Sequence, residues 1–112
     1  MADDRAGAAL RKALLLLDHG RAERAESVLR GILHETSDPL WQVRARVVLG
    51  EHLHGRGRHD EALAVLTEVP RLGVPDADDD VVAYELRRAG ELLARLRGRR
   101  GPVVAGAAGA RG

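Results

Sequence analysis

Several residue types are scarce or absent in this chain, and each absence narrows what the protein can be. The 112 residues include no cysteine and no phenylalanine, and aromatic residues make up only 2%. Without cysteine the chain has no disulfide framework and no thiolate to act as nucleophile or metal ligand, which fits a reducing compartment. Without phenylalanine the core must consist of leucine, valine and alanine, of which leucine and alanine are strong helix formers. The composition therefore predicts an all-helical protein of the cytoplasm.

The chain also lacks a large net charge and a long apolar run. Its formal net charge is +1, which argues against a globally basic nucleic-acid-binding protein. The longest run of large apolar residues, Leu14–Leu17, is far shorter than the roughly 20 residues that span a bilayer. Asp3 and Asp4 precede this run and no small-residue cleavage site follows it, so we expect neither a signal peptide nor a membrane partner. Lys12 is the only lysine among 18 Lys and Arg residues, a bias that we interpret as bacterial, GC-rich coding.

One segment of the sequence occurs twice. Residues 16–33 align without gaps on residues 53–70. The identical pairs are Leu16/Leu53, Gly20/Gly57, Arg21/Arg58, Ala25/Ala62, Val28/Val65 and Leu29/Leu66. A self-match at such a period predicts stacked helix–turn–helix units.

Apolar periodicity and capping residues predict five helices. Gly20 suits the end of the first helix, and Asp38 followed by Pro39 suits the start of the third. Negative charge is stabilising at a helix start, so the acidic stretch at 76–80 suits the start of the last helix. The expected helices cover residues 3–18, 21–34, 39–54, 60–69 and 78–97. Short turns favour antiparallel neighbours, so we predict an all-α stack of αα-hairpins.

The expected organisation is one helical domain and a tail. The domain covers residues 1–97, with units at about 3–34 and 39–69 and a C-terminal capping helix at about 78–97. Residues 98–112, GRRGPVVAGAAGARG, have little to bury, and we expect a flexible Gly/Ala/Arg tail there.

The repeated hairpin resembles the tetratricopeptide repeat (TPR) family over residues 8–97. The second unit carries the best match, with Trp41, Ala45, Leu49, Gly50 and Leu53 in its first helix and Gly57, Ala62, Leu66 and Val69 in its second. The resemblance implies that small residues such as Gly50 let the two helices approach closely, and that the last helix seals the end of the stack. The step from Ala25 to Ala62 is 37 residues (62 − 25), longer than the family's unit of about 34.

TPR proteins bind peptides or partner helices on the concave faces of their first helices, so the resemblance implies candidate positions here. They are Arg44, Val47, Glu51 and His54 in the third helix and Tyr84, Arg87 and Glu91 in the last. The first helix would add Leu10, Leu14 and Leu17. Because an arginine fork suits a carboxylate, we expect a peptide with an apolar anchor and an acidic group. The alternative is that the three leucines are core and the arginines are solvated surface.

No pattern in the sequence indicates catalysis, a metal or another cofactor. His52 and His54 point to different faces of a helix, and no cysteine could complete a zinc site. The calcium-loop-like start at Asp76 has Val81 and Arg87 where such a loop requires glycine and glutamate. No nucleophile elbow and no phosphate-binding glycine motif occurs. We therefore expect a protein–protein interaction module without catalytic activity.

Two alternative interpretations assign the chain a different partner. A basic cluster near the C-terminus could make the chain a regulatory module of a transcriptional or nucleic-acid-associated assembly. The cluster consists of Arg95, Arg97, Arg99 and Arg100. No interleaved aromatic residue could stack on bases, which disfavours this alternative. The second alternative is a homodimer, in which apolar edges of an incomplete stack cover one another.

Overall fold

Helices joined by short turns make up the part of the chain that the structure describes. The computed structural model describes residues 2–72 and 80–109. Its elements are α1 (Ala2–Asp18), α2 (Ala22–Glu35), α3 (Pro39–Gly55), α4 (His59–Thr67), the short 3-10 helix η1 (Val69–Arg71) and α5 (Asp80–Gly109). No strand occurs within these two ranges. The predicted all-α class is confirmed, and the first three predicted helices agree with the structure to within one residue at each end.

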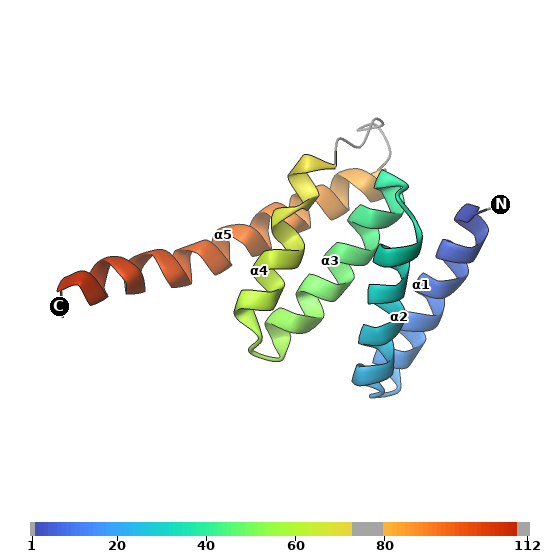
Figure 1. Cartoon of the computed structure of the whole chain (residues 1–112), viewed down its shortest axis with the longest axis horizontal. Coiled ribbons are helices and arrows are strands. Elements are labelled where there is room, and N and C mark those ends of the chain that lie inside the picture. Colours follow the sequence, from blue (N-terminus) through green and yellow to red (C-terminus); the bar gives the residue numbers. More distant parts are fainter. Residues whose placement is uncertain (1, 73–79, 110–112) are drawn as a thin grey trace.

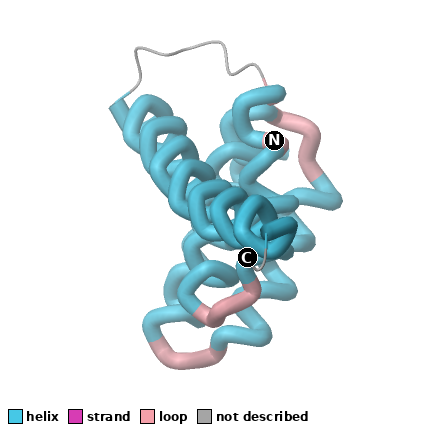
Figure 2. Tube along the Cα trace, turned by 90° about the vertical axis from the view of Figure 1, so that its left-hand side faces the viewer, coloured by secondary structure: helices cyan, strands magenta, loops and turns pink. Residues whose placement is uncertain are grey.

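The helices form two antiparallel hairpins that stand side by side. α1 pairs with α2, α3 pairs with α4, and both hairpin turns lie at the same end of the stack (Figure 1). α3 is the central helix, since it contacts all four other α-helices. α5 contacts α3, α4 and η1, and Figure 2 shows it inclined across the hairpins. Within the described residues, α5 therefore covers the end of the stack opposite α1.

The two hairpin turns have the same backbone geometry. Gly20 and Gly57 adopt φ values of 74° and 79°, in the left-handed region that glycine favours. In the first turn the Arg21 amide donates to the Leu16 carbonyl at 2.8 Å, and in the second the Arg58 amide donates to the Leu53 carbonyl at 2.9 Å. In each turn the glycine amide donates a second hydrogen bond, which spans fewer residues than the first. The two bonds together make each turn a Schellman motif. The repeat seen in the sequence is thus a repeat of backbone conformation.

Side chains of α3 and its N-cap form hydrogen bonds with backbone groups at the ends of three helices. Asp38 Oδ1 accepts a hydrogen bond from the Leu40 amide at 3.0 Å, which confirms the predicted N-cap. Gln42 Nε2 donates to the carbonyls of Leu33 at 2.8 Å and Thr36 at 2.7 Å, at the C-terminal end of α2. Arg46 Nη1 donates to the Val65 carbonyl at 3.1 Å, near the end of α4. α3 therefore supplies donors to carbonyls that the ends of α2 and α4 leave without helical partners.

Leucine dominates the core, as the lack of phenylalanine predicted. The largest fully buried side chains belong to the second hairpin, α2 and α5: Leu29, Leu49, Leu53, Leu66, Leu92 and Leu96. Ala25 and Ala62, which are equivalent in the repeat, are both 0% exposed. Small residues at these positions let α2 and α4 pack closely on their neighbours.

The fifth helix differs from its predicted bounds. The sequence predicted that it ends near Arg97, but α5 continues to Gly109, and its last part projects from the bundle (Figure 1). Leu96 is the last buried residue among the described side chains. The buried apolar positions of α5 therefore end at Leu96. The helix itself continues because its backbone hydrogen bonds join residues only four positions apart and do not require burial. The acidic residues predicted at the helix start, Asp76 to Asp79, lie outside the described residues, and α5 begins at Asp80.

Candidate functional site

The predicted binding wall brings together α3 and α5, and ion pairs cross between the two helices. Arg44 Nε lies 3.5 Å from Glu85 Oε1, and the Arg44 guanidinium stands 5.3 Å from the centre of the Trp41 ring. Burial raises the pKa of Glu85, an effect that the nearby Arg44 charge partly offsets. Arg44 is therefore occupied by neighbours within the chain, and its side chain remains 30% exposed.

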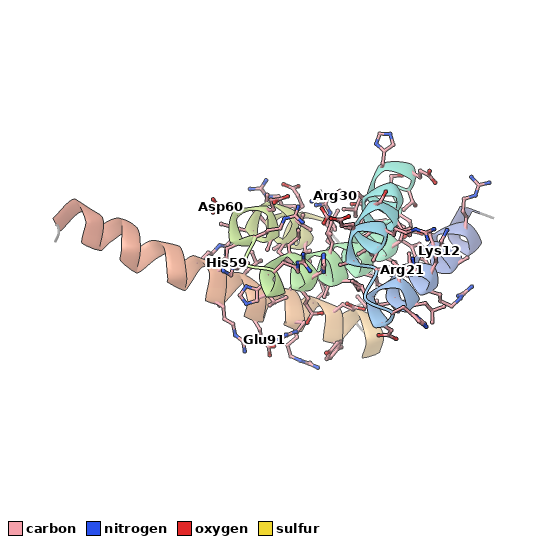
Figure 3. The ribbon with its side chains drawn as sticks, turned by 90° about the horizontal axis from the view of Figure 1, so that it is seen from below. Lys12, Arg21, Arg30, His59, Asp60 and Glu91 are labelled. Carbon is pink, nitrogen blue, oxygen red and sulfur yellow. The ribbon has the colours of Figure 1, made fainter. Side chains whose placement is uncertain are left out.

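Two further predicted residues share one arginine that the sequence analysis did not select. Arg88 Nε lies 2.6 Å from Glu51 Oε2, and Arg88 Nη1 lies 3.3 Å from Glu91 Oε1. The hydrogen bond that Arg88 donates to Glu51 is the main cause that raises the pKa of Arg88. Glu51 and Glu91 thus share Arg88, and the pair with Glu51 joins α3 to α5, whereas the pair with Glu91 lies within α5. Figure 3 shows Glu91 on the opposite side of the molecule from Arg30 and Asp60.

The structure corrects one predicted binding residue and places another at the end of the wall. Val47 is 1% exposed and belongs to the core, so it cannot contact a partner. The reason is that α3 is covered on several sides, which leaves it no solvent-facing stripe at this position. His54 Nδ1 lies 3.2 Å from His59 Nδ1, so His54 faces the start of α4. One ring must donate in this contact and the other must accept.

Tyr84 and Arg87 are the predicted residues that stay most accessible. Tyr84 is 56% exposed, and Arg87 is exposed one turn later on α5. No acidic side chain of the described residues pairs with Arg87. Of the three leucines predicted on α1, Leu10 is buried in the core, Leu17 is half-buried and Leu14 is 41% exposed. For Leu10 the alternative interpretation as core is therefore correct.

A second cluster, on α2 and α4, was missed by the sequence analysis. Arg58 donates to both carboxylate oxygens of Glu26, at 2.7 and 3.0 Å, and to both of Glu61, at 2.8 and 2.7 Å. Arg30 also contacts Glu26, with Nε 3.1 Å from Oε2. The hydrogen bond from Arg58 is the largest cause that lowers the pKa of Glu26, and it lowers the pKa of Glu61 as well. The identity of Arg21 and Arg58 in the repeat marked this position, but it could not reveal the carboxylates.

An open hollow of about 360 Å³ lies at the turn end of the first hairpin. Its lining consists of Gly20, Arg21, Ala22, Glu23, Arg24 and Arg56. Three arginines thus face one carboxylate, and no acidic side chain of the described part of the chain forms an ion pair with any of the three. The local charge is therefore positive at a place where the sequence predicted only a turn.

The remaining candidate sites are less defined. Arg95 and Arg97 of the basic cluster are exposed on α5, whereas Arg99 and Arg100 lie outside the described side chains. Among the described residues, no group of three His, Asp or Glu side chains could hold a metal ion. No helix in the same part of the chain is long and apolar enough to cross a membrane.

Comparison of the chain with protein-family models, with curated proteins and with solved structures finds no match. The TPR resemblance of the sequence therefore stays a prediction.

Proposed function

We propose that this chain is a TPR-like protein-interaction module that binds a peptide or helix of another protein and catalyses no reaction. The observation that carries the proposal is the repeated hairpin, with matching Schellman turns at Gly20 and Gly57 and the two hairpins side by side. Stacked hairpins are a common architecture for extended binding surfaces. The proposed setting is the cytoplasm of a bacterium.

The proposed binding surface is the wall formed by α3 and α5. The ion pairs from Arg44 to Glu85 and from Glu51 to Arg88 hold the two helices in a defined arrangement. A surface that is ordered in advance loses less conformational entropy when a partner binds. The wall can therefore act as a rigid platform rather than as an adaptable loop.

The accessible side chains of the wall suggest the chemistry of the partner. Tyr84 offers a largely exposed ring with a hydroxyl group, and Arg87 offers a guanidinium without an ion pair among the described residues. Aromatic and arginine side chains are enriched in interface hot spots. A peptide with an apolar side chain next to a carboxylate would suit this pair.

Photo-crosslinking in the native host would test the proposal. A benzophenone amino acid in place of Tyr84 should trap a specific protein, and the variant that also carries Arg87→Glu should trap much less of it. Arg97→Glu is a matched control, because it makes the same charge change at an exposed position of the same helix. Equal trapping by the Arg87 and Arg97 variants would contradict the proposed surface.

The nucleic-acid alternative predicts a different result. Deletion of residues 98–112 should leave protein capture at Tyr84 intact if the wall is the binding surface. Salt-sensitive DNA binding that disappears with this deletion would favour the alternative.

A further inference from the structure

The second hairpin docks on the first through an arginine, and the equivalent arginine of the first hairpin forms no ion pair with any described residue. Arg58 reaches across to α2 and binds both carboxylate oxygens of Glu26. His52, on α3, also faces Glu26, with 3.9 Å between His52 Nε2 and Glu26 Oε1. Side chains of α3 and of the N-cap of α4 in the second hairpin thus both face Glu26.

Arg21 occupies the position in the first hairpin that Arg58 occupies in the second. Their backbone conformations agree, with φ and ψ of −98° and 63° for Arg21 and −89° and 67° for Arg58. Because the backbone sets the direction of the Cα–Cβ bond, the Arg21 side chain starts in the same direction relative to the first hairpin as the Arg58 side chain does relative to the second. For Arg58 that direction leads to the hairpin before it, whereas no described helix lies beyond α1 at that end of the stack (Figure 1).

The glutamate that follows Arg58 in the second hairpin has no equivalent after Arg21. Three residues after Arg58 stands Glu61, but three residues after Arg21 stands Arg24. Arg56, which belongs to the turn of the second hairpin, lines the hollow beside Arg21 and Arg24, and it adds a third positive charge there. The first hairpin therefore presents positive charge where the second has a balanced network.

An exposed apolar residue accompanies this charge. Leu15 lies 37 residues before His52 (52 − 15), so it occupies the equivalent position on the first helix of its hairpin. The His52 side chain is 9% exposed because α2 covers it, whereas Leu15 is 59% exposed. The outer edge of the first hairpin, defined by Leu15, Arg21 and Arg24, is thus the uncovered equivalent of the surface that docks on α2, with Leu15 in place of His52 and Arg24 in place of Glu61.

We infer that this outer edge binds an acidic amphipathic helix of another protein, which presents a carboxylate to Arg21 and an apolar side chain to Leu15. The bound helix would lie as α2 lies against the second hairpin. This edge is separate from the α3–α5 wall, so either surface can fail a test without the other.

A second copy of this chain, stacked head to tail, does not fit the same edge. The residue equivalent to Glu26 in the second hairpin is Leu63, which offers no carboxylate (63 − 26 = 37). Leu63 packs against the core, and α5 lies on α4. Charge complementarity therefore selects an acidic partner helix over self-association by stacking.

The chain supplies a probe for this edge. A synthetic peptide of residues 22–35, which is the sequence of α2, carries Glu26 in the register that Arg58 recognises. Such a short helix is marginal in water, so a staple between positions 27 and 31 would hold it in the helical state. Ser27 is exposed and a Cβ at Gly31 would meet no atom within 4 Å, so the staple leaves the Glu26 face clear.

Fluorescence anisotropy with the labelled peptide and the full chain would test the inference. Arg21→Gln should weaken binding by about fivefold to tenfold, as expected for loss of a charged hydrogen-bonded pair. The Glu26→Gln peptide should lose the same factor, and the two changes together should lose little more. Arg21→Glu with a Glu26→Arg peptide should recover part of the affinity.

Arg97→Gln is the matched control, since Arg97 is an exposed arginine of α5 that lies outside both proposed surfaces. Equal loss with Arg97→Gln and Arg21→Gln would overturn the inference, as would affinity that Arg21→Gln leaves unchanged. Absence of saturable binding by a peptide with confirmed helicity would overturn it too. Circular dichroism of each variant would verify that the helices remain folded.

Discussion

Leu66 of α4 packs directly on the backbone of Gly50 in α3. A Cβ placed on Gly50 would stand 2.6 Å from Leu66 Cγ and 2.7 and 2.9 Å from its two Cδ atoms. Leu66 is 0% exposed, so its branched side chain has no open space into which it could withdraw. The close approach of α3 and α4 thus requires glycine at this position.

Gly50→Ala is therefore expected to destabilise the protein. Overpacking costs about 1–3 kcal/mol, and the better helix propensity of alanine offsets about 1 kcal/mol of this. We expect the free energy of unfolding to fall by about 1 kcal/mol, measured by urea denaturation. Gly90→Ala in α5 is the control: a Cβ there meets no atom within 4 Å, so that variant should be more stable than the wild type.

The two turn glycines should respond alike to substitution. Gly20 and Gly57 both adopt positive φ, so alanine at either position should lower the free energy of unfolding by about 1–2 kcal/mol. Gly31→Ala, within α2 and without positive φ, should instead be neutral or stabilising. A much larger loss at one turn than at the other, measured by thermal denaturation, would contradict their equivalence.

Gln42 and Arg46 should act as a coupled pair. Arg46 Nε donates to Gln42 Oε1 at 3.0 Å, while Gln42 binds carbonyls at the end of α2 and Arg46 binds one near the end of α4. Gln42→Leu leaves buried acceptors without donors and should cost about 1–3 kcal/mol of unfolding free energy. In a double-mutant cycle, Arg46→Met should cost measurably less when Gln42 is already replaced, and strict additivity would contradict the coupling.

Acid should weaken the contact between the hairpins. Arg58 holds the pKa of Glu26 below its usual value of 4.5, so ionised Glu26 stabilises the folded state above that pH. This stabilisation is lost as the pH falls through and below 4.5, when Glu26 becomes protonated in the folded state. Denaturation between about pH 6 and about pH 3 should show a smaller loss of stability for Arg58→Gln than for the wild type.

Glu85 should affect the pH dependence of stability in the direction opposite to that of Glu26. Burial raises its pKa, so its neutral form is favoured by folding, and its stabilising contribution is lost as the pH rises through that raised value. Glu85→Gln removes this contribution and should make the loss of stability on acidification steeper than in the wild type. An unchanged slope would indicate that Arg44 balances the burial of Glu85 fully.

Local patterns in the sequence determined the helices and turns of the two hairpins. Hydrophobic periodicity, the Asp38–Pro39 cap and the glycines at 20 and 57 act within a few residues of themselves, so their outcome does not depend on the rest of the chain. The repeat likewise predicted two equivalent turns, which the structure confirms in their hydrogen bonds.

The tertiary structure alone decided which surfaces are accessible. The resemblance to TPR proteins placed Val47 on the binding face, but a helix with neighbours on several sides buries residues at such a position. Similarly, the pairing of Glu51 with Arg88 and of Glu26 with Arg58 depends on how helices far apart in sequence approach one another. With 31% of its residues charged, the chain offers many alternative pairs, and only distance selects among them.

The open edge of the first hairpin illustrates both contributions. The sequence determined that Arg21 repeats Arg58, because identical residues at identical turns adopt the same backbone. Only the tertiary structure decided that Arg58 meets carboxylates while Arg21 meets none within the described residues. The physical reason is that backbone conformation is set locally, whereas the neutralisation of a charge depends on which helix is packed beside it.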